Sequence, residues 1–465
     1  MNREELDKKI SEAFSDLVID KALVRSLKIR DKRTIPSFVE EWLISRFQKS
    51  GKSNADIYQD VTAFMSKHLP AKTEKERIKH ELQSGETVTI LDRFNVRIDI
   101  AKDKKMLTIP CIEETSARVS NEVIEQNPIL LEGGQWGAGR LMVRSEGRIN
   151  VIEMVDFKPM QSGKVDLQAL IKAREHFSTR EWIALLLRTM GYEPSAYTKA
   201  QQNNLILRLL PLVQNNLNMM ELAPKGTGKS FIFSNLSRYV WVNSGGALTQ
   251  AQLFKNLNTK EIGLMGRYDL LVLDEGQSIS FKGADDIHAK FKDYLESGHY
   301  SIGNDKITSE CGLMILANID LYHDGSPRRR DYIRHLPPMF HDSALIDRFH
   351  GIVAGWEIPR FTTECAAQGV GIKADVFGEY LHQLRLVSHH EFPFGESPPL
   401  KGDSRDVKAV ERLAKALSKL LLLNPDHADY EKFVLTPAKA LRQRVRSQLV
   451  ELDSHEFSGW LDVSV

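Results

Sequence analysis

Cysteine is scarce in this chain of 465 residues, which contains only three: Cys111, Cys311 and Cys365. No two of them form a CxxC pair, so we do not expect a structural zinc site. Scattered free thiols are typical of a reducing compartment. We therefore expect a cytoplasmic protein.

Long apolar runs are missing as well. No stretch reaches the roughly 20 apolar residues that a membrane-spanning helix needs. The N-terminal segment 1–7 is charged and has no apolar core of the kind found in signal peptides. We expect neither a membrane anchor nor a membrane partner.

The chain also lacks an excess of either charge. It has 63 Lys and Arg against 62 Asp and Glu, a net charge of +1, so any nucleic-acid surface must be a local patch. We find no internal repeat and no low-complexity segment. With 42% hydrophobic residues the composition is that of a globular protein, and the length predicts more than one domain.

One short stretch carries a specific signal. Residues 221–230 end in Gly-Lys-Ser, between a predicted strand at 216–222 and a predicted helix at 231–239. A strand, a glycine-containing turn and a helix in this order form a phosphate cradle of backbone N–H groups. Lys229 is expected to reach the β- and γ-phosphates of ATP, and Ser230 to bind Mg²⁺.

The P-loop departs from the usual pattern at one position. Ala223 stands where a glycine is common, and its methyl group fits only if the residue has a negative φ. The residues expected to hold the nucleotide are Ala223, Pro224, Lys225, Gly226, Thr227, Gly228, Lys229, Ser230 and Asp274, with Ser230 and Asp274 as the metal ligands.

Two further strands bring chemistry to the same predicted sheet edge. Residues 269–275 form an apolar run ending in Asp274 and Glu275, and 312–318 form another ending in Asn318. Asp274 suits the Mg²⁺ shell, and Glu275 is placed to polarise an attacking water. Asn318 would lie between these carboxylates and the γ-phosphate, because ligands bind at the carboxyl ends of a doubly wound sheet.

Changes of composition divide the chain into five predicted parts. The fold class is an α/β P-loop ATPase core with a C-terminal helical lid, preceded by an α+β N-terminal region with a small OB-like β-barrel. The predicted parts are a helical region at 1–84, a strand-rich module at 85–160, a helical linker region at 161–205, the ATPase core at 206–360, and the lid with the C-terminal tail at 361–465.

Short strands separated by polar turns indicate the barrel. A glycine-rich stretch at 133–139 is expected to be a loop with an aromatic tip. A capping box at 178–181 and a helix beginning at 403–406 are expected further along. The predicted barrel strands are 87–91, 94–100, 106–109, 130–132, 139–144 and 151–155, with a turn at 102–105.

A cluster of basic residues follows the first predicted helix. It consists of Lys21, Arg25, Lys28, Arg30, Lys32 and Arg33. The cluster is either a solvated face of the protein or a surface that contacts DNA phosphates. The sequence leaves both interpretations open.

The order of these motifs resembles the MCM-like branch of the AAA+ ATPases. That resemblance implies a ring of six subunits and leaves open whether two rings stack into a dodecamer. In such a ring, Arg348 of Asp347-Arg348-Phe349 would act as an arginine finger on a neighbour's nucleotide. Arg405 resembles the sensor-2 arginine. The hairpin at 300–307, with Lys306 at its expected tip, would point into the ring's pore, and 277–283 lies where the branch has an insertion.

More narrowly, the chain resembles the BrxL family, the Lon-like AAA+ proteins of bacterial BREX phage-defence systems. Residues 177–182, 191–192 and 268–275 carry this resemblance. It implies phage defence, double-stranded DNA bound without sequence preference, and other defence proteins as partners. The Lon-like protease domain that typically follows the ATPase is absent, as in a truncated form or a short relative, so we assign no proteolysis to the chain.

Three functions remain open at this point. The first is an ATP-driven ring motor on DNA, and the second is a Lon-type protein unfoldase, for which Tyr300 and Ile302 are the available pore residues. The third is a DNA clamp or scaffold that uses ATP only for loading. All three require ATP, Mg²⁺ and the candidate catalytic residues Glu275, Asn318, Arg348 and Arg405.

Overall fold

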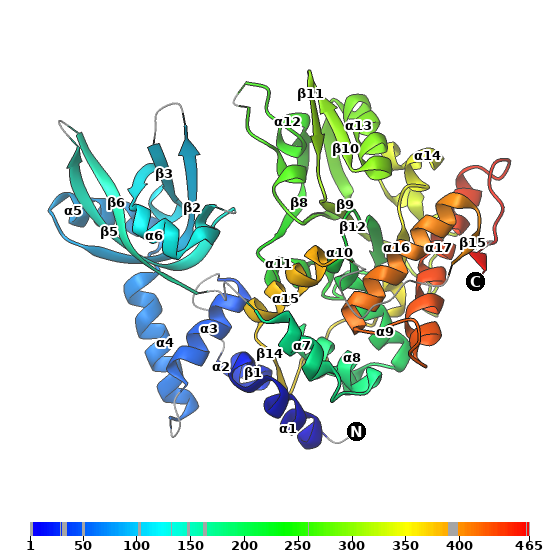
Figure 1. Cartoon of the computed structure of the whole chain (residues 1–465), viewed down its shortest axis with the longest axis horizontal. Helices are drawn as coiled ribbons and strands as arrows, with labels where there is room; N and C mark the ends of the chain where they lie inside the picture. The colour runs from blue at the N-terminus through cyan, green and yellow to red at the C-terminus, as the bar shows by residue number, and fades with distance from the viewer. Residues whose placement is uncertain are drawn as a thin grey trace. The chain divides into compact units, whose positions relative to one another are not determined.

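The chain folds into two compact units (Figure 1). One unit contains residues 1–18, 166–372 and 377–465, and the other contains 19–165 and 373–376. The computed structural model describes residues 3–27, 29, 35–48, 52–100, 104–131, 133–146, 149–160, 165–258, 260–388, 399–461 and 463–464. None of the described helices is both long and apolar enough to cross a membrane.

The larger unit is built on a parallel five-stranded sheet (Figure 1). Its order is β13-β7-β12-β9-β8, so the P-loop strand β7 has β12 on one side and β13 on the other. The strands are β7 (Met219–Ala223), β8 (Val240–Thr249), β9 (Leu270–Lys282), β12 (Gly312–Asn318) and β13 (Gly351–Ala354). Their apolar residues are buried on both faces, as expected for a parallel sheet covered by helices.

Helices surround this sheet, and a hairpin of β10 (His299–Ile302) and β11 (Asp305–Thr308) precedes β12. The helices are α1 (Arg3–Phe14), α7 (Leu167–Arg174), α8 (Thr179–Thr189), α9 (Lys199–Ile206), α10 (Leu210–Val213), α11 (Lys229–Asn235), α12 (Gln250–Leu253), α13 (Ala284–Ser297), α14 (Ser343–Ile346), α15 (Ala374–Leu386), α16 (Ser404–Leu421) and α17 (Thr436–Leu452).

Local capping signals were predicted correctly. Ser178 and Glu181 form the capping box that begins α8. Asp403 caps α16 by accepting from the backbone N–H groups of Arg405 and Asp406. Element ends were less accurate, since β7 begins at Met219 and α11 ends at Asn235.

The smaller unit contains a closed five-stranded barrel in the order β2-β3-β4-β6-β5. Its strands are β2 (Val88–Asp99), β3 (Lys104–Ile109), β4 (Glu114–Val119), β5 (Gln135–Glu146) and β6 (Ile149–Pro159), and its helices are α2 (Lys21–Leu27), α3 (Ser37–Phe47), α4 (Asn54–His68), α5 (Lys75–Gln83) and α6 (Asn121–Gln126). Phe94, Leu107, Leu141 and Met154 fill its core. The predicted barrel is therefore present.

Several predictions within the barrel were wrong. The two strands expected at 87–91 and 94–100 are one continuous strand, β2, and β4 was not predicted. The strand expected at 130–132 is instead a 3₁₀ turn over Pro128–Leu131. Lys104 and Lys105, expected in a turn, already belong to β3.

The glycine-rich stretch at 133–139 is not a loop with an aromatic tip, because β5 begins at Gln135. A Cβ at Gly137 would lie 2.4 Å from the Phe157 ring, and one at Gly139 would lie 2.6 Å from the Phe94 ring. These glycines make room for aromatic rings packed against a strand. The glycines of this stretch reflect close packing. Glycine content alone does not distinguish a closely packed strand from a flexible turn.

A buried histidine beside β13 gives the larger unit a predicted pH response. The backbone N–H of Asn218 donates to His350 Nδ1 at 3.1 Å. Burial, together with Arg412 and Arg442 nearby, lowers the pKa of His350 from 6.5 to about 3. The folded chain therefore keeps this ring neutral where the unfolded chain protonates it.

We expect the free energy of unfolding to fall as the pH drops below 6.5, by about 1.4 kcal/mol per pH unit from this one group. The sign follows because the unfolded state binds the extra proton between pH 6.5 and 3. Urea denaturation at several pH values measures it. His350→Asn keeps an acceptor near the Asn218 N–H and removes the titration. Equal slopes for both proteins would contradict the assignment.

Candidate nucleotide site

The P-loop connects β7 to α11 and has the backbone that a phosphate cradle requires. Gly226 and Gly228 have φ values of +85° and +76°, a region that side chains with a Cβ rarely adopt. Ala223 lies in extended strand backbone, paired in register with Asn318. The condition for a methyl group at this position is therefore met.

A second glycine explains how the alanine is tolerated. Gly355 follows β13 directly, and a Cβ there would lie 2.6 Å from the Cβ of Ala223. The P-loop has a methyl group at Ala223 where a glycine is common, and the neighbouring strand is followed by a glycine, Gly355, that leaves space for this methyl group. Segment 359–364, which is exposed, also contacts the loop, since the Phe361 N–H donates to the Gly226 carbonyl at 2.8 Å.

The structure brings the predicted lysine and asparagine together. Lys229 Nζ donates to Asn318 Oδ1 at 2.6 Å, and only 7% of the lysine is exposed. Burial lowers the pKa of Lys229, while Glu221 and Asp274 act in the opposite direction. The backbone of Asn318 is held in turn, because its backbone N–H donates to Gln277 Oε1 at 3.1 Å.

The two carboxylates follow in the middle of β9. Asp274 is buried, and its Oδ1 accepts from the Glu275 N–H at 2.9 Å. Glu275 is exposed and has a φ of +52°, which is unusual for a residue with a side chain. The β8–β9 register shifts between Ser244 and Gly246, directly opposite. Bulges are places where a strand can re-aim a side chain, and here the exposed Glu275 directly follows the buried Asp274.

These residues fit a nucleotide with Mg²⁺. Thr227 is 1% exposed and its Oγ1 has no hydrogen-bond partner, so the loop holds a buried polar atom that an incoming ligand could satisfy. Ser230 and Asp274 supply the hydroxyl and carboxylate oxygens that Mg²⁺ prefers. Within the described residues no group of three or more His, Cys, Asp or Glu side chains could hold a metal ion.

Sequence reasoning missed the group that supports the loop. Arg208 and Glu221 form an ion pair with Nη2–Oε1 and Nε–Oε2 distances of 2.5 and 2.8 Å, and neither side chain is exposed. Arg208 Nη1 also donates to the Tyr192 hydroxyl at 2.7 Å and to the Thr227 carbonyl at 3.3 Å. The Tyr192 hydroxyl lies 3.4 Å from the Gly228 carbonyl.

A signal for this group exists in the sequence. Glu221 is a charged residue inside an apolar strand, and Arg208 is a lone cation in the leucine-rich segment 205–213. Charged residues are almost never fully buried unless they are paired. The two anomalies together indicate a buried pair behind the P-loop.

Arg348 and Arg405 lie together, and the contacts they make do not include the P-loop. Arg348 Nε is 3.2 Å from Glu296 Oε2, and Arg348 Nη1 donates to the Ala344 carbonyl. Arg405 Nη2 is 3.8 Å from the same Glu296 oxygen, and its Nη1 lies 2.7 Å from Asp347 Oδ2. Both predicted arginines therefore belong to one edge of the larger unit, which we call the arginine edge: Glu296, Asp347, Arg348 and Arg405.

Asp347 ties this edge to the helices at the C-terminal end of the described chain. Arg442 on α17 lies 2.6 Å from Asp347 Oδ1 and 2.6 Å from Asp406 Oδ1. It also donates to the Asp347 and Phe349 carbonyls. The turn that carries Arg348 is therefore fixed by a buried network.

Arg334 and the run Arg328-Arg329-Arg330 are the alternatives to Arg348 as the finger, and two of these four side chains make contacts of their own. Arg329 pairs with Asp331 at 2.8 Å, and Arg328 Nε donates to the Leu321 carbonyl. Arg334 is exposed, and the Arg330 carbonyl accepts from Gln448.

The DNA candidates fall into two groups. Lys28, Arg30, Lys32 and Arg33 lie outside the described residues. Lys21, from the same predicted cluster, is buried and paired with Glu41 at 2.6 Å, so it belongs to neither a solvated face nor a phosphate-binding surface. Its burial behind an ion pair was not visible in the charge pattern.

The hairpin at 300–307 is present, but its details differ from the prediction. The tip is Gly303-Asn304, and Lys306 is an exposed residue on β11 opposite Ser301. Tyr300 and Ile302 are each 1% exposed and belong to the hydrophobic core. The segment expected as an insertion, 277–283, instead continues β9 to Lys282.

Comparison with known proteins covers both units. Residues 152–461 match the family model described as "Lon-like protease BrxL-like, ATPase domain", and residues 12–143 match "BREX system Lon protease-like protein BrxL N-terminal". Two similar proteins are each named "Lon-like protease BrxL". The one from Escherichia coli O9:H4 (strain HS) is 30% identical to this chain over 97% of its residues, and the one from Bacillus cereus (strain H3081.97) is 30% identical over 98%. The chain spans 66% and 68% of their lengths, about two thirds.

Mutation can test whether side chains at positions 223 and 355 compete for the same space. We expect Gly355→Ala to destabilise the protein by about 1–3 kcal/mol, because the new methyl group would overpack Ala223. Ala223→Gly in the same protein should recover part of that loss. Chemical denaturation of the two single variants and the double variant measures this. Strictly additive losses would show that the two residues do not compete for the same space.

Proposed function

Since the chain belongs to the BrxL family, Lon-like proteins of BREX systems with an AAA+ ATPase domain, we propose that it is an ATP-hydrolysing ring protein that encircles double-stranded DNA in phage defence. One observation carries the ring: the arginine edge is held by Glu296 and Asp347, while the P-loop, Asp274 and Asn318 form a separate group. A complete ATPase site then needs two subunits. A hexamer, alone or stacked in pairs, and action in the cytoplasm with other defence proteins belong to the same proposal.

The nucleotide side of the site has defined parts. The backbone of 224–228 and the Lys229 ammonium group would bind the phosphates, and burial strengthens that attraction by excluding water. Glu275, which is exposed, would accept the proton of the attacking water. Asn318, fixed by Gln277 and Lys229, would orient that water. Ser230 and Asp274 would hold Mg²⁺, which neutralises charge on the phosphates when bound.

The arginine edge would complete the site of a neighbouring subunit. Arg348 keeps Nη2 free of the contacts with Glu296 and Ala344, and Arg405 is 47% exposed. The Arg348 side chain is 17% exposed, so Arg405 is the more accessible of the two, and Arg348 would offer its Nη2 group to a phosphate. Glu296 is itself 46% exposed, and an ion pair of this kind is worth only about 0–1 kcal/mol. Exchanging it for a γ-phosphate would cost little, and a cation there stabilises the transition state.

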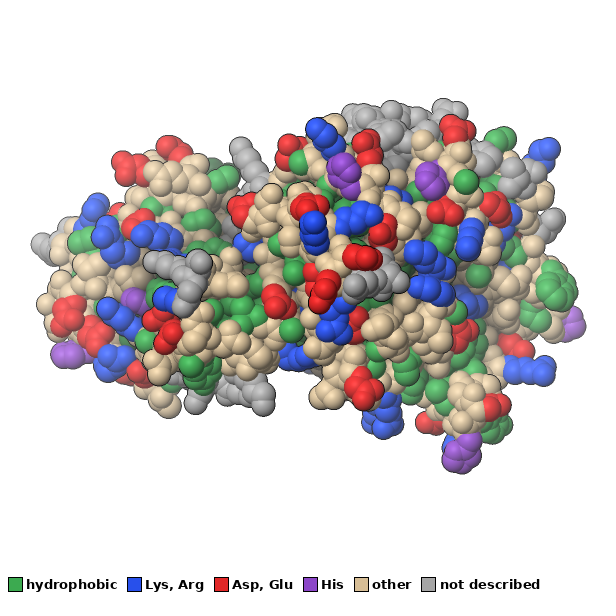
Figure 2. Space-filling model, turned by 90° about the horizontal axis from the view of Figure 1, so that it is seen from below, with side chains coloured by type: hydrophobic (Ala, Val, Ile, Leu, Met, Phe, Trp, Pro, Cys, Tyr) green, Lys and Arg blue, Asp and Glu red, His purple; other side chains and the backbone are tan. Residues whose placement is uncertain are grey.

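DNA binding would depend on local groups. The face in Figure 2 carries basic and acidic side chains intermixed, without a broad field of one sign over its described residues. The supporting features are the exposed Lys306 on the hairpin and the closed barrel, whose order places β4 beside β6 in parallel as in OB-like barrels. Lys28, Arg30, Lys32 and Arg33 remain candidates from sequence alone.

Of the two alternative functions, the DNA clamp has more support than the protein unfoldase. A Lon-type unfoldase would need aromatic or apolar residues exposed in the pore, whereas Tyr300 and Ile302 are buried. A clamp that uses ATP only for loading would use the same residues as a motor. Separation of a forked duplex favours the motor, and retention on circular DNA without strand separation favours the clamp.

Mixing two inactive variants tests the shared site. We expect Glu275→Gln and Arg348→Ala each to bind ATP and lose turnover by two or more orders of magnitude, since each removes a transition-state interaction but leaves Lys229. Mixed rings should regain part of the turnover, because some interfaces pair an intact Glu275 with an intact Arg348. Steady-state ATPase assays of the mixtures measure it.

The control is Glu275→Gln mixed with an Arg348→Ala, Glu275→Gln double variant, which restores no complete interface. If subunits exchange and the first mixture stays inactive, Arg348 does not act in trans. Arg334 or the 328–330 run would then replace it as the candidate.

DNA binding is expected to be insensitive to sequence and to weaken steeply with salt, because phosphates dominate it. Lys306→Glu should reduce both the affinity and the slope of log K against log salt. Fluorescence anisotropy with two unrelated duplexes measures these quantities. Lys408→Glu, an exposed lysine on α16, is the matched control. Equal affinities for the two variants would exclude the hairpin from the DNA surface.

A further inference from the structure

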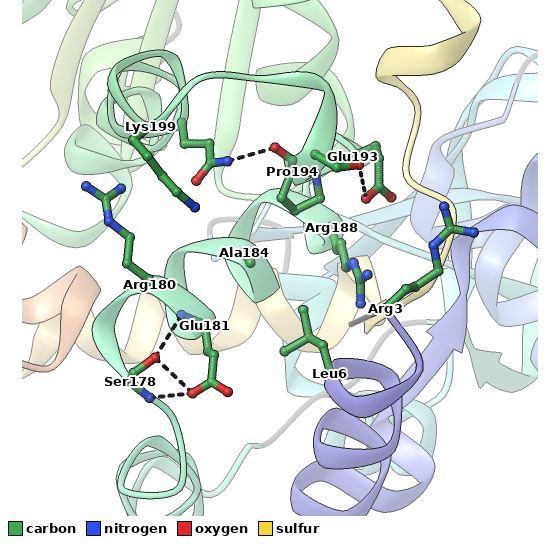
Figure 3. Close-up of a pocket in the computed structure, with 12 residues that line it drawn as sticks. Arg3, Leu6, Ser178, Arg180, Glu181, Ala184, Arg188, Glu193, Pro194 and Lys199 are labelled. Atoms are coloured by element: carbon green, nitrogen blue, oxygen red, sulfur yellow. Dashed lines mark hydrogen bonds between the residues drawn. The ribbon is translucent and has the colours of Figure 1, made fainter. Parts of the chain in front are cut away.

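A cavity of about 620 Å³ lies in the larger unit, apart from the P-loop residues (Figure 3). Its walls come from α1, α8, the turn after Tyr192 and the start of α9. Figure 3 shows Lys199 and Arg188 on opposite sides of Ala184. The lining residues are Arg3, Leu6, Ser178, Arg180, Glu181, Ala184, Arg188, Glu193, Pro194, Ser195, Lys199 and Gln202.

The lining is cationic: four of these residues are Arg or Lys and two are Glu. Both carboxylates are engaged by the protein itself. Glu181 accepts from Ser178 and pairs with Lys9 at 2.9 Å. Glu193 accepts from the Ser195 hydroxyl at 3.0 Å and from the Gln368 N–H at 3.0 Å. The carboxylates are therefore poorly placed to neutralise the cations across the cavity.

Arg188 is the most informative of the lining residues. It is 3% exposed, and its Nη1 lies 2.5 Å from Asp7 Oδ1. Its Nε is buried and has no hydrogen-bond partner, although a buried donor without an acceptor costs stability. With Nη1 engaged, Nε and Nη2 form a second fork of the guanidinium group, and such a fork matches the oxygens of a phosphate or carboxylate.

Arg180 differs from Arg188, which pairs with Asp7, because the contacts that hold Arg180 carry no negative charge. Burial lowers its pKa, and Asp429 compensates only in part. Its Nη1 donates to a neutral partner, Asn203 Oδ1, at 2.9 Å, and its guanidinium group lies over the Phe433 ring. Neither contact neutralises the charge.

We propose that this cavity is a binding site for a phosphate-bearing small molecule, separate from the ATP site. The volume falls in the range of about 300–1,000 Å³ typical of ligand pockets, which exceeds the needs of a single inorganic ion. Several cations without free counter-charges suit a polyanion better than a monocarboxylate. Arg188 would supply the buried anchor, and the exposed Arg3 and Lys199 would close on the ligand from the rim.

The site also lies next to the support of the P-loop. Glu193 and Pro194 line the cavity, and the residue before them, Tyr192, contacts both Arg208 and the Gly228 carbonyl. None of the lining residues belongs to the P-loop, Asp274 or Asn318. A ligand in the cavity can therefore be distinguished from one in the ATP site by mutation.

Isothermal titration calorimetry with inorganic triphosphate tests the site. The titration uses the 465-residue Lys229→Ala protein, in which the P-loop has lost its lysine ammonium group. We expect binding to persist in this protein and to weaken about tenfold or more when Lys199→Glu is added, since a charge-assisted hydrogen bond is lost and repulsion is gained. Arg188→Gln should have a similar effect, with circular dichroism to establish that the variant is folded.

Lys172→Glu, an exposed lysine on α7 outside the cavity, is the matched control and should leave the affinity unchanged. Loss of all triphosphate binding in Lys229→Ala, or equal weakening by Lys172→Glu and Lys199→Glu, would overturn the proposal. Citrate, with a comparable charge on carboxylates, is the second probe. Equal affinity for citrate would overturn the assignment to phosphate.

Discussion

The buried ion pair of Arg208 and Glu221 is the constraint on which the nucleotide site depends. Removing two charges from water is costly unless their hydrogen-bonding groups are satisfied. Here the pair is fully buried, and the remaining Arg208 donor reaches the Tyr192 hydroxyl and the Thr227 carbonyl. Strand, loop and the turn at Tyr192 are thereby fixed to one guanidinium group. Movement of the strand would leave a buried charge unpaired, and movement of the loop or the turn would leave a buried Arg208 N–H group without an acceptor, so the P-loop is held in shape before any ligand arrives.

The arginine edge also depends on ion pairs, but some of its pairs are buried and others are exposed to water. On its inner side Arg442 is 1% exposed and pairs with Asp347 and Asp406, so the turn before β13 is rigid. On its outer side Arg348 and Arg405 share the half-exposed Glu296, where water weakens each ion pair. A rigid base with exchangeable outer contacts suits a surface that must meet another subunit. The cavity beside Tyr192 is a third case, in which a buried guanidinium group has only part of its hydrogen bonds.

The strands that carry the candidate site residues were predictable because their signals are local. Gly-Lys-Ser after a strand, Asp274-Glu275 at the end of an apolar run, and Asn318 at the end of another each need only a few adjacent residues. The barrel was predictable in kind from alternating strands. Its errors arose where distant residues decide: Gly137 and Gly139 face aromatic rings of other strands, and Lys21 is buried by Glu41. The φ of +52° at Glu275 also depends on pairing with β8.

The sequence by itself indicated the α/β type of the core, the lysine proposed to bind phosphate and the succession along the chain of the strands that end in the candidate site residues. These follow from hydrophobic periodicity and from turn and capping residues, which act over a few positions. Only the tertiary structure decided which charges are paired in the interior, that Gly355 makes room for Ala223, and that Arg348 and Arg405 share one edge. Those outcomes depend on contacts between residues far apart in the chain, and the free energy of a charge depends on which partners surround it after folding.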